Sequence, residues 1–248
     1  MVLLLLVDLD PGLTALRPLG GFFVLRTSDA PARPLPTLAE TYGGGTSDVY
    51  VDSMTFRVRK VGAALRAPET RVAASVAQQG LAARLWSVAL GCAVRYGTLP
   101  DLDPEILRWD PDAGAPDDLW LTEVRPAPGD LAETVLEGHL RPLTDLVRTR
   151  YGIAEGLLWG NVASALAGSA RLLEQWARTR GRSEEAERTR ALTARLLGHP
   201  LLAGTGTLTG TAFRRRSCCL YYRVPGGGVC GDCCFARPPR SSPRAASG

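Results

Sequence analysis

Five of the six cysteines in this 248-residue chain lie close together near its C-terminal end. They are Cys218, Cys219, Cys230, Cys233 and Cys234, and the sixth is Cys92. Proteins that depend on disulfides spread their cysteines along the chain, so that distant loops are joined. One local cluster, with a single other thiol elsewhere, is typical of a metal site in a reducing compartment.

The spacing of the first four clustered cysteines would let them converge on one metal centre. The pattern is two adjacent cysteines, ten residues, a cysteine, two residues and a final cysteine. Cys230 and Cys233 have the separation at which a turn directs two thiolates to one ion, and Gly231 gives that turn a permissive backbone. Pro225 and the three glycines after it predict a reversal that carries the chain back to the first two cysteines.

Four thiolates suit either a tetrahedral zinc ion or an iron–sulfur cluster. A single zinc ion is usually held by two CxxC-type turns, whereas adjacent cysteines tend to point apart. A [2Fe–2S] rhomb offers more ligand positions, so the Cys218-Cys219 pair favours iron–sulfur over zinc and leaves zinc as the alternative. A Rieske centre needs two histidines. The chain has only His139 and His199, far from the cysteines in sequence, which favours ligation by cysteine alone.

The amino-acid sequence around these cysteines resembles that of a known family. Segment 213–233 contains Arg-Arg-Ser-Cys-Cys-Leu-Tyr-Tyr-Arg and Cys-Gly-Asp-Cys, and it closely resembles the C-terminal segment of the FhuF-type ferric-siderophore reductases. The resemblance implies a [2Fe–2S] cluster whose ligands are Cys218, Cys219, Cys230 and Cys233. Cys234 is an additional thiol beyond the family pattern. Residues 65–200 resemble the helical body of the family only loosely, and the first 50 residues show no resemblance.

The same resemblance implies an iron–sulfur oxidoreductase that reduces Fe(III) in a siderophore and releases Fe(II) in the cytoplasm. Hydroxamate and catecholate oxygens are hard ligands that favour Fe(III), so the addition of one electron weakens the complex. The expected partners are a ferric siderophore, preferably of the hydroxamate type, and a separate electron donor. The alternative is a zinc- or cluster-stabilised binding module, or an electron carrier, linked to siderophore metabolism.

Charge and hydropathy argue against two other classes of partner. A net charge of +4 is too small to predict nucleic-acid binding. No uninterrupted apolar stretch reaches the about twenty residues that a transmembrane helix needs. The apolar start of the chain lacks the basic residues and the cleavage site of a secretory signal. These features predict a cytoplasmic protein, either free or peripheral to the inner membrane.

The positive charge is concentrated at the C-terminal end. Residues 211–248 hold seven arginines and one aspartate, whereas the first 210 residues hold 22 basic and 24 acidic residues. A [2Fe–2S] cluster with four thiolates carries about −2 when oxidised and about −3 when reduced. We therefore expect the nearby arginines to compensate it, namely Arg214, Arg215, Arg216 and Arg223. Three of them are also candidates for binding an anionic ferric complex, namely Arg215, Arg216 and Arg223.

The predicted fold class is mainly α with minor β. It comprises an irregular segment 1–50, a helical body 51–210, a [2Fe–2S]-binding segment 211–235 and a disordered tail 236–248. Apolar residues at spacings of three and four predict four helices. These span 69–96 with a break near Gly80, 130–151 with Asp130 as its N-cap, 154–178, and 183–198. A short strand is predicted at 119–124, and loops at 100–118 and 203–212.

A few other residues could carry chemistry, but each has a simpler interpretation. Cys92 lies on the apolar face of its helix and is predicted to be a buried core thiol. His139 has no evident partner, so a structural or surface role is expected. Trp159 and Asn161, in the segment Leu158-Trp159-Gly160-Asn161, could line a pocket, but close packing is favoured. The Tyr221-Tyr222 pair is expected to shield the cluster from water.

Overall fold

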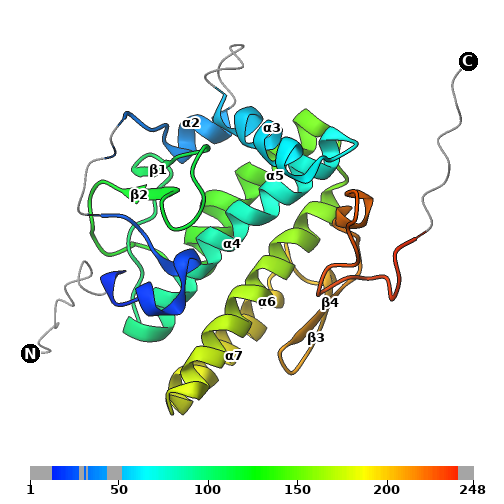
Figure 1. Ribbon diagram of the computed structural model, residues 1–248. Coiled ribbons are helices and arrows are strands. Elements are labelled where there is room, and N and C mark those ends of the chain that lie inside the picture. Colours follow the sequence, from blue (N-terminus) through cyan, green and yellow to red (C-terminus); the bar gives the residue numbers. More distant parts are fainter. Residues whose placement is uncertain (1–12, 28–30, 32, 44–51, 240–248) are drawn as a thin grey trace, which may run out of the picture.

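The computed structural model describes residues 13–27, 31, 33–43 and 52–239, and Figure 1 shows a helical body with two small hairpins. Helix accounts for 55% of the chain and strand for 8%, which confirms the mainly α prediction. The last part of the predicted disordered tail, residues 240–248, lies outside the described residues.

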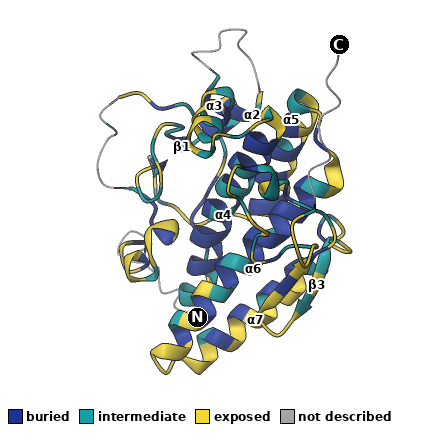
Figure 2. Cartoon of the chain, turned by 45° about the vertical axis from the view of Figure 1, so that its right-hand side comes forward, coloured by how far each residue is buried: buried dark blue, intermediate teal, exposed yellow. Residues whose placement is uncertain are grey.

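Two long helices form the centre of the body, α4 (Thr70–Tyr96) and α6 (Glu155–Thr179). They lie side by side (Figures 1 and 2), and most of their residues are buried. Both are rich in alanine and serine. These small side chains favour helix or tolerate it, and they let the two backbones approach closely. The Oγ atoms of Ser87 and Ser169 meet between them at 2.9 Å.

The predicted break in the first helix near Gly80 is wrong, because α4 continues through this position without interruption. A glycine inside a helix costs about 1 kcal/mol relative to alanine. Burial of apolar side chains before and after Gly80, such as Ala77 and Leu81, outweighs that local cost.

Three further helices pack around this pair: α3 (Ser53–Leu65), α5 (Arg141–Tyr151) and α7 (Ser183–Leu197). The π-helical turn η3 (Ala132–Leu140) runs directly into α5, so together they form the predicted helix 130–151. Asp130 caps its start as expected, since its Oδ1 accepts hydrogen bonds from the backbone N–H groups of Ala132 and Glu133. The wider π turn immediately precedes Pro142, which has no N–H to donate to an earlier carbonyl.

Two antiparallel hairpins complete the body. Strand β1 (Leu107–Trp109) pairs with β2 (Leu119–Leu121), and β3 (Gly206–Thr209) pairs with β4 (Ala212–Arg215). The predicted strand at 119–124 is confirmed in its first half. The loops predicted at 100–118 and 203–212 are wrong where β1, β3 and the start of β4 occur. Each of these strands has only three or four residues, too few to produce a clear alternating pattern in the sequence.

The described part of segment 1–50 contains three short helical elements: η1 (Arg17–Leu19), η2 (Gly21–Phe23) and α2 (Leu38–Gly43). Its apolar side chains belong to the same core as the helices. Phe23 is fully buried against Gly91 of α4, where an added Cβ would lie 3.1 Å from its ring. Arg84, also on α4, holds this segment by donating from Nη2 to the Val24 carbonyl at 2.7 Å and by pairing with buried Asp118.

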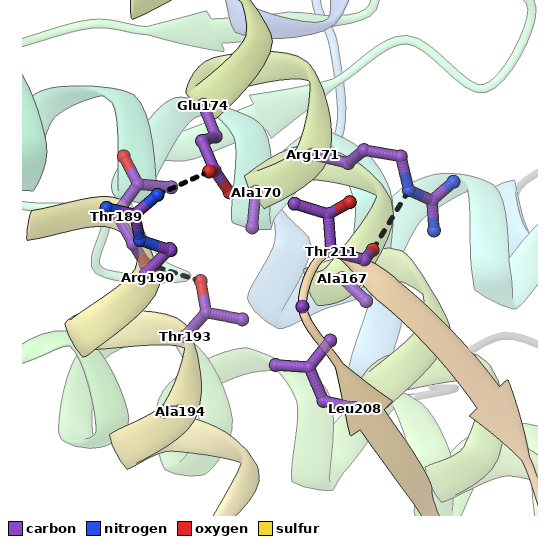
Figure 3. A pocket seen from close by; sticks show the side chains of 11 residues that line it. Ala167, Ala170, Arg171, Glu174, Thr189, Arg190, Thr193, Ala194, Leu208 and Thr211 are labelled. Carbon is purple, nitrogen blue, oxygen red and sulfur yellow. Dashed lines mark hydrogen bonds and ion pairs between the residues drawn. The ribbon is translucent and has the colours of Figure 1, made fainter. Parts of the chain in front are cut away.

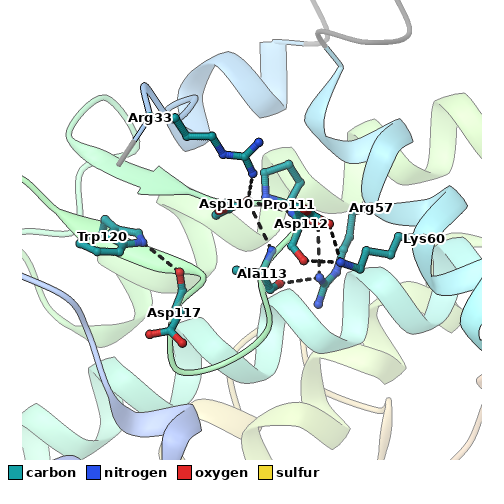
Figure 4. Close-up of polar contacts among 9 residues, drawn as sticks. All are labelled: Arg33, Arg57, Lys60, Asp110, Pro111, Asp112, Ala113, Asp117 and Trp120. Carbon is teal, nitrogen blue, oxygen red and sulfur yellow. Dashed lines mark hydrogen bonds and ion pairs between the residues drawn. The ribbon is translucent and has the colours of Figure 1, made fainter. Parts of the chain in front are cut away.

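The loop between β1 and β2 is tied to its surroundings by exposed polar contacts (Figure 4). Arg33 pairs with Asp110 at 2.8 Å, Lys60 pairs with Asp112, and Arg57 donates to the carbonyl of Ala113 at 2.7 Å. Exposed ion pairs of this kind contribute little net stability. In the described part of the chain, none of the helices combines the length and the apolar character needed to cross a bilayer.

His139 has the structural role expected of it. Its side chain is fully buried, with Nε2 donating to the Leu102 carbonyl and Nδ1 3.0 Å from the Tyr42 hydroxyl. Burial lowers the pKa of His139 to about 4. The neutral imidazole with its proton on Nε2 satisfies both contacts, so the fold selects the uncharged form.

This burial predicts a pH-dependent contribution to stability. An unfolded histidine takes up a proton near pH 6.5, whereas folded His139 stays neutral down to about pH 4. The fold is therefore most stabilised above pH 6.5 and loses about 3 kcal/mol of this contribution as the pH falls through that window. Urea unfolding at several pH values should show a smaller acid-side loss for His139→Gln than for the native chain. The control His199→Gln should behave like the native chain, and equal slopes for all three proteins would contradict the assignment.

Candidate metal centre

The hairpin of β3 and β4 leads directly into the cysteine segment. Strand β4 ends at Arg215, the adjacent cysteines follow, and the 3-10 helix η4 (Tyr221–Arg223) begins the reversal. Gly226 has a φ of +72°, which favours glycine. A Cβ at Gly227 would lie 2.7 Å from the Tyr221 carbonyl oxygen. Both glycines are therefore required for the tight turn that brings the chain back.

The reversal places the thiols of distant cysteines together. The Sγ atoms of Cys219 and Cys230 are 3.6 Å apart. Cys230 and Cys233 form a turn in which the Cys233 N–H donates to the Cys230 carbonyl at 3.1 Å. Among the described residues, no three histidine, cysteine or acidic side chains converge closely enough to form a metal-binding set. The polypeptide thus gathers the sulfur donors on one loop without closing a ligand shell.

Backbone amides and neighbouring charges act on the sulfurs of this loop. The N–H of Leu220 donates to Cys218 Sγ at 3.3 Å, and the N–H of Phe235 donates to Cys233 Sγ at 3.4 Å. The hydrogen bond with Cys230 lowers the pKa of Cys219 to about 6, and the Arg215 charge adds to this effect. Both contacts favour the thiolate form of Cys219, which is the form needed of a metal ligand.

A buried polar network seats the loop on the two central helices. Ser75 of α4 donates from Oγ to the Cys219 carbonyl at 2.8 Å. Asn161 of α6 donates from Nδ2 to the Ser75 carbonyl, to Ser75 Oγ and to Gln78 Oε1, each at 3.0 Å. Asn161 therefore does more than the close packing expected of it. The sequence analysis missed Ser75 and Gln78, although two polar residues three apart on an otherwise apolar helix face were a usable signal.

Gly160 explains the close contact between the cysteine segment and α6. A Cβ at this position would lie 2.3 Å from Ser217 Oγ and 3.1 Å from Arg215 Nη2. Ser217 Oγ donates to the Gly156 carbonyl at 3.0 Å, and Arg215 Nη2 donates to the Leu157 carbonyl at 3.2 Å. Backbone carbonyls in the first turns of α6 thus bind Arg215 and Ser217, the residues that lead into the cysteines.

Asp232, inside the CxxC turn, fastens the other half of the loop. Its carboxylate accepts hydrogen bonds from Ser164 Oγ at 2.6 Å and from Arg171 Nη2 at 2.8 Å, and both partners belong to α6. Its backbone carbonyl accepts the N–H of Arg215. Arg171 also lines a cavity of about 200 Å³ between α6, α7 and the hairpin, and its Nε donates to the Thr211 carbonyl (Figure 3).

Two family models match the chain. Residues 61–212 match the family described as "Ferric iron reductase FhuF-like transporter", and residues 215–235 match the "FhuF 2Fe-2S C-terminal domain". The chain belongs to this FhuF-like ferric iron reductase family. The first match covers more than half of the chain. The similarity to the family is therefore not limited to the cysteine segment but includes the helical body. No curated protein matches it.

The FhuF-like family carries a [2Fe–2S] cluster in its C-terminal domain, which confirms the predicted cofactor and a role as an iron–sulfur ferric reductase. The residues of this chain fit such a cluster. Thiols are the donors that iron–sulfur centres prefer, and the matched segment contains five of them. Backbone N–H groups already point to two sulfurs, and such hydrogen bonds tune the reduction potential of iron–sulfur centres.

The candidate arginines of the FhuF-like chain fall into different environments. Arg214 and Arg216 are exposed, whereas Arg215 is only 2% exposed. Arg223 is half-buried, pairs with Glu69 and lies 5.6 Å over the ring of Tyr222. Of the three candidates for binding an anionic ferric complex, Arg216 is therefore exposed, Arg223 is half-buried and Arg215 is buried. Burial of Arg215 favours charge compensation over substrate docking for this residue.

Cys92 lies in the core of α4, far along the chain from the cysteine segment, as predicted. It is fully buried, and burial raises the pKa of its thiol to about 12. A neutral thiol in an apolar core is a poor nucleophile and a poor metal ligand. Cys92 is therefore a packing residue of the helical body.

The Asp232 contacts predict how firmly the loop holds its metal. Asp232→Ala removes both hydrogen bonds to α6, so iron should be lost to a chelator severalfold faster, as followed by the decay of visible absorbance. The helical circular dichroism should stay unchanged, because the core helices do not depend on this contact. Asp145→Ala, which removes an exposed carboxylate on α5, is the matched control. Equal rates of iron loss in the two variants would contradict the role of Asp232.

Proposed function

We propose that this FhuF-like reductase delivers single electrons to Fe(III) held in a siderophore, preferably of the hydroxamate type, and so releases Fe(II) in the cytoplasm. The proposed cluster ligands are Cys218, Cys219, Cys230 and Cys233. The family supports the ferric reductase activity. The observations below support the ligand set and the docking of a ferric siderophore, and the release of Fe(II) in the cytoplasm is a further part of the proposal.

The ligand set is supported by spacing and by local contacts. The Sγ atoms of Cys219 and Cys230 lie close together in space. Cys233 ends the CxxC turn, which is closed by the hydrogen bond from its N–H to the Cys230 carbonyl. Cys233 Sγ accepts the N–H of Phe235, and Cys218 Sγ accepts that of Leu220. The carbonyl of Cys234 accepts a hydrogen bond from the exposed Arg214, and its thiol interacts with Cys233. The CxxC spacing and the backbone N–H donated to Cys233 Sγ favour Cys233 over Cys234 as the fourth ligand.

The chemistry required is a one-electron transfer. A bound [2Fe–2S] cluster supplies one electron at a time. Fe(III) in the complex gains this electron and becomes Fe(II), no bond to carbon changes, and a separate protein donor restores the electron. Hard oxygen ligands hold Fe(II) less tightly, so the iron can leave. The protein must therefore offer only a docking surface close to the cysteines.

The observation that carries the proposal is the open surface of the cysteine segment. Tyr221, Val229 and Phe235 are each more than a third exposed, so this short segment presents three large apolar side chains at its surface. Exposed Arg214 and Arg216 precede them in the same segment. The nearby cavity of about 200 Å³ is smaller than the about 300–1,000 Å³ of typical ligand pockets. A bulky ferric complex is therefore expected to dock on this open surface, beside the proposed ligands, and not in that cavity.

The ligand set predicts the behaviour of serine variants. Cys218→Ser, Cys219→Ser, Cys230→Ser and Cys233→Ser should each lose most of the visible absorbance of the cluster, because each removes one thiolate. Cys234→Ser and Cys92→Ser should keep it. Absorbance and iron content of the purified variants measure this. A coloured Cys233→Ser protein together with a colourless Cys234→Ser protein would overturn the assignment of the fourth ligand.

The proposed substrate predicts a single-turnover reaction. Chemically reduced protein, mixed anaerobically with a ferric hydroxamate complex and an Fe(II) trap, should be reoxidised with one trapped Fe(II) per cluster. With a ferric catecholate complex, which is anionic, the rate should fall for Arg216→Gln, most clearly at low ionic strength, where the attraction is least screened. With the ferric hydroxamate complex, whose iron core is neutral, the rate should depend less on this charge. A reduced cluster that no ferric siderophore reoxidises, but that a protein acceptor oxidises readily, would favour the alternative of an electron carrier.

A further inference from the structure

Arg215 is a buried arginine whose guanidinium is only partly used. Its Nη2 donates to the Leu157 carbonyl at 3.2 Å. Its Nε and Nη1 are buried and have no hydrogen-bond partner in the structure. Within the described residues, Arg215 also forms no ion pair with a carboxylate, since Asp232, its neighbour in the backbone pairing, is taken by Arg171 and Ser164. Burying a charge with unpaired donors is strongly unfavourable unless something compensates it.

The surroundings of Arg215 fix its orientation. Its backbone N–H donates to the Asp232 carbonyl, which places it between the hairpin and the CxxC turn. Gly160 makes room for it, since a Cβ there would lie 3.1 Å from Nη2 and 3.6 Å from Nε. A side chain held by both the loop and α6 is not free to swing out to water.

Among the described residues no carboxylate pairs with this guanidinium, and the groups that follow it most closely in the chain and can become negative are the thiols of the loop that begins at Cys218. The charge of Arg215 acts on this loop: after the hydrogen bond with Cys230, it helps to lower the pKa of Cys219. The next residue, Arg216, is exposed, whereas Arg215 is buried.

We propose that Arg215 is a cofactor-contacting residue, whose Nε–H and Nη1–H donate to the sulfur atoms of the [2Fe–2S] centre and whose buried charge raises its reduction potential. The proposal uses the cofactor of the family and the ligand set proposed above, and it does not depend on a siderophore as the substrate. A buried positive charge favours the more negative reduced state, and N–H donors to sulfur act in the same direction. Arg215 would therefore set the potential at which electrons leave this protein.

The matched variants are Arg215→Gln and Arg216→Gln, which remove the same charge from adjacent residues, one buried and one exposed. Redox titration of the loaded proteins should show a more negative potential for Arg215→Gln, by about 59 mV or more, equivalent to about tenfold in the one-electron equilibrium constant. Arg216→Gln should change that constant less than about threefold, because solvent and salt screen its charge. Equal shifts in the two variants, or none in Arg215→Gln, would overturn the proposal.

A second measurement holds even if Arg215→Gln loads no cluster. In native protein labelled with ¹⁵N-arginine, paramagnetic resonance of the reduced cluster should show hyperfine coupling to arginine nitrogen. The coupling should persist in Arg216→Gln and vanish in Arg215→Lys, which keeps the charge but not the directed N–H pair. Absence of coupling in the native protein, or its survival in Arg215→Lys, would overturn the proposal. Neither readout involves a ferric complex, so failure of the siderophore assay alone would count only against the proposed function.

Discussion

Residues 215–217 lie against helix α6 at Gly160, where an added Cβ would lie 2.3 Å from Ser217 Oγ and 3.1 Å from Arg215 Nη2, so that the Ser217 side chain would have to move. The adjacent cysteines, Cys218 and Cys219, follow Ser217 directly, so this close contact with α6 positions the start of the cysteine segment. The first turns of α6 reinforce it with the carbonyls of Gly156 and Leu157. The absence of a Cβ at Gly160 therefore lets the cysteine segment lie close to α6, although the cysteines follow some sixty residues later in the chain.

The helical body contributes polar groups to the loop at a cost that its own packing must offset. Three buried polar residues lie between α4 and α6, namely Ser75, Gln78 and Asn161. If stability were the only requirement, apolar side chains would suffice at these positions. Buried polar groups are tolerated when they are hydrogen-bonded, and Asn161 Nδ2 bonds to both Ser75 and Gln78, while Ser75 bonds to the Cys219 carbonyl. Asn161 Oδ1 is buried and has no partner among the described residues. The network ties one half of the loop to the core, and Asp232 ties the other half to α6.

Charge follows the same division between inside and outside. The seven arginines of the C-terminal end form a single group in the sequence. In the structure, Arg215 is buried, Arg223 is paired with Glu69, and Arg214 and Arg216 are exposed. Arginines within ten positions of each other therefore lie in different dielectric environments, so the same charge is screened at the surface and only weakly screened in the interior.

The cysteine spacing, the cofactor it implies and the class of fold can be predicted from the order of the amino acids alone. The proposed ligands, Cys218, Cys219, Cys230 and Cys233, lie on one loop, and the apolar faces of the long helices extend over many turns. Both patterns therefore occur within continuous stretches of sequence, where they can be recognised. The short strands were not recognisable, because three or four residues carry too little periodicity. Only the tertiary structure decided the roles of Ser75, Gly160 and Arg215. Their partners lie on other elements, and burial, which separates Arg215 from Arg216, is a property of the packed chain and not of the residue.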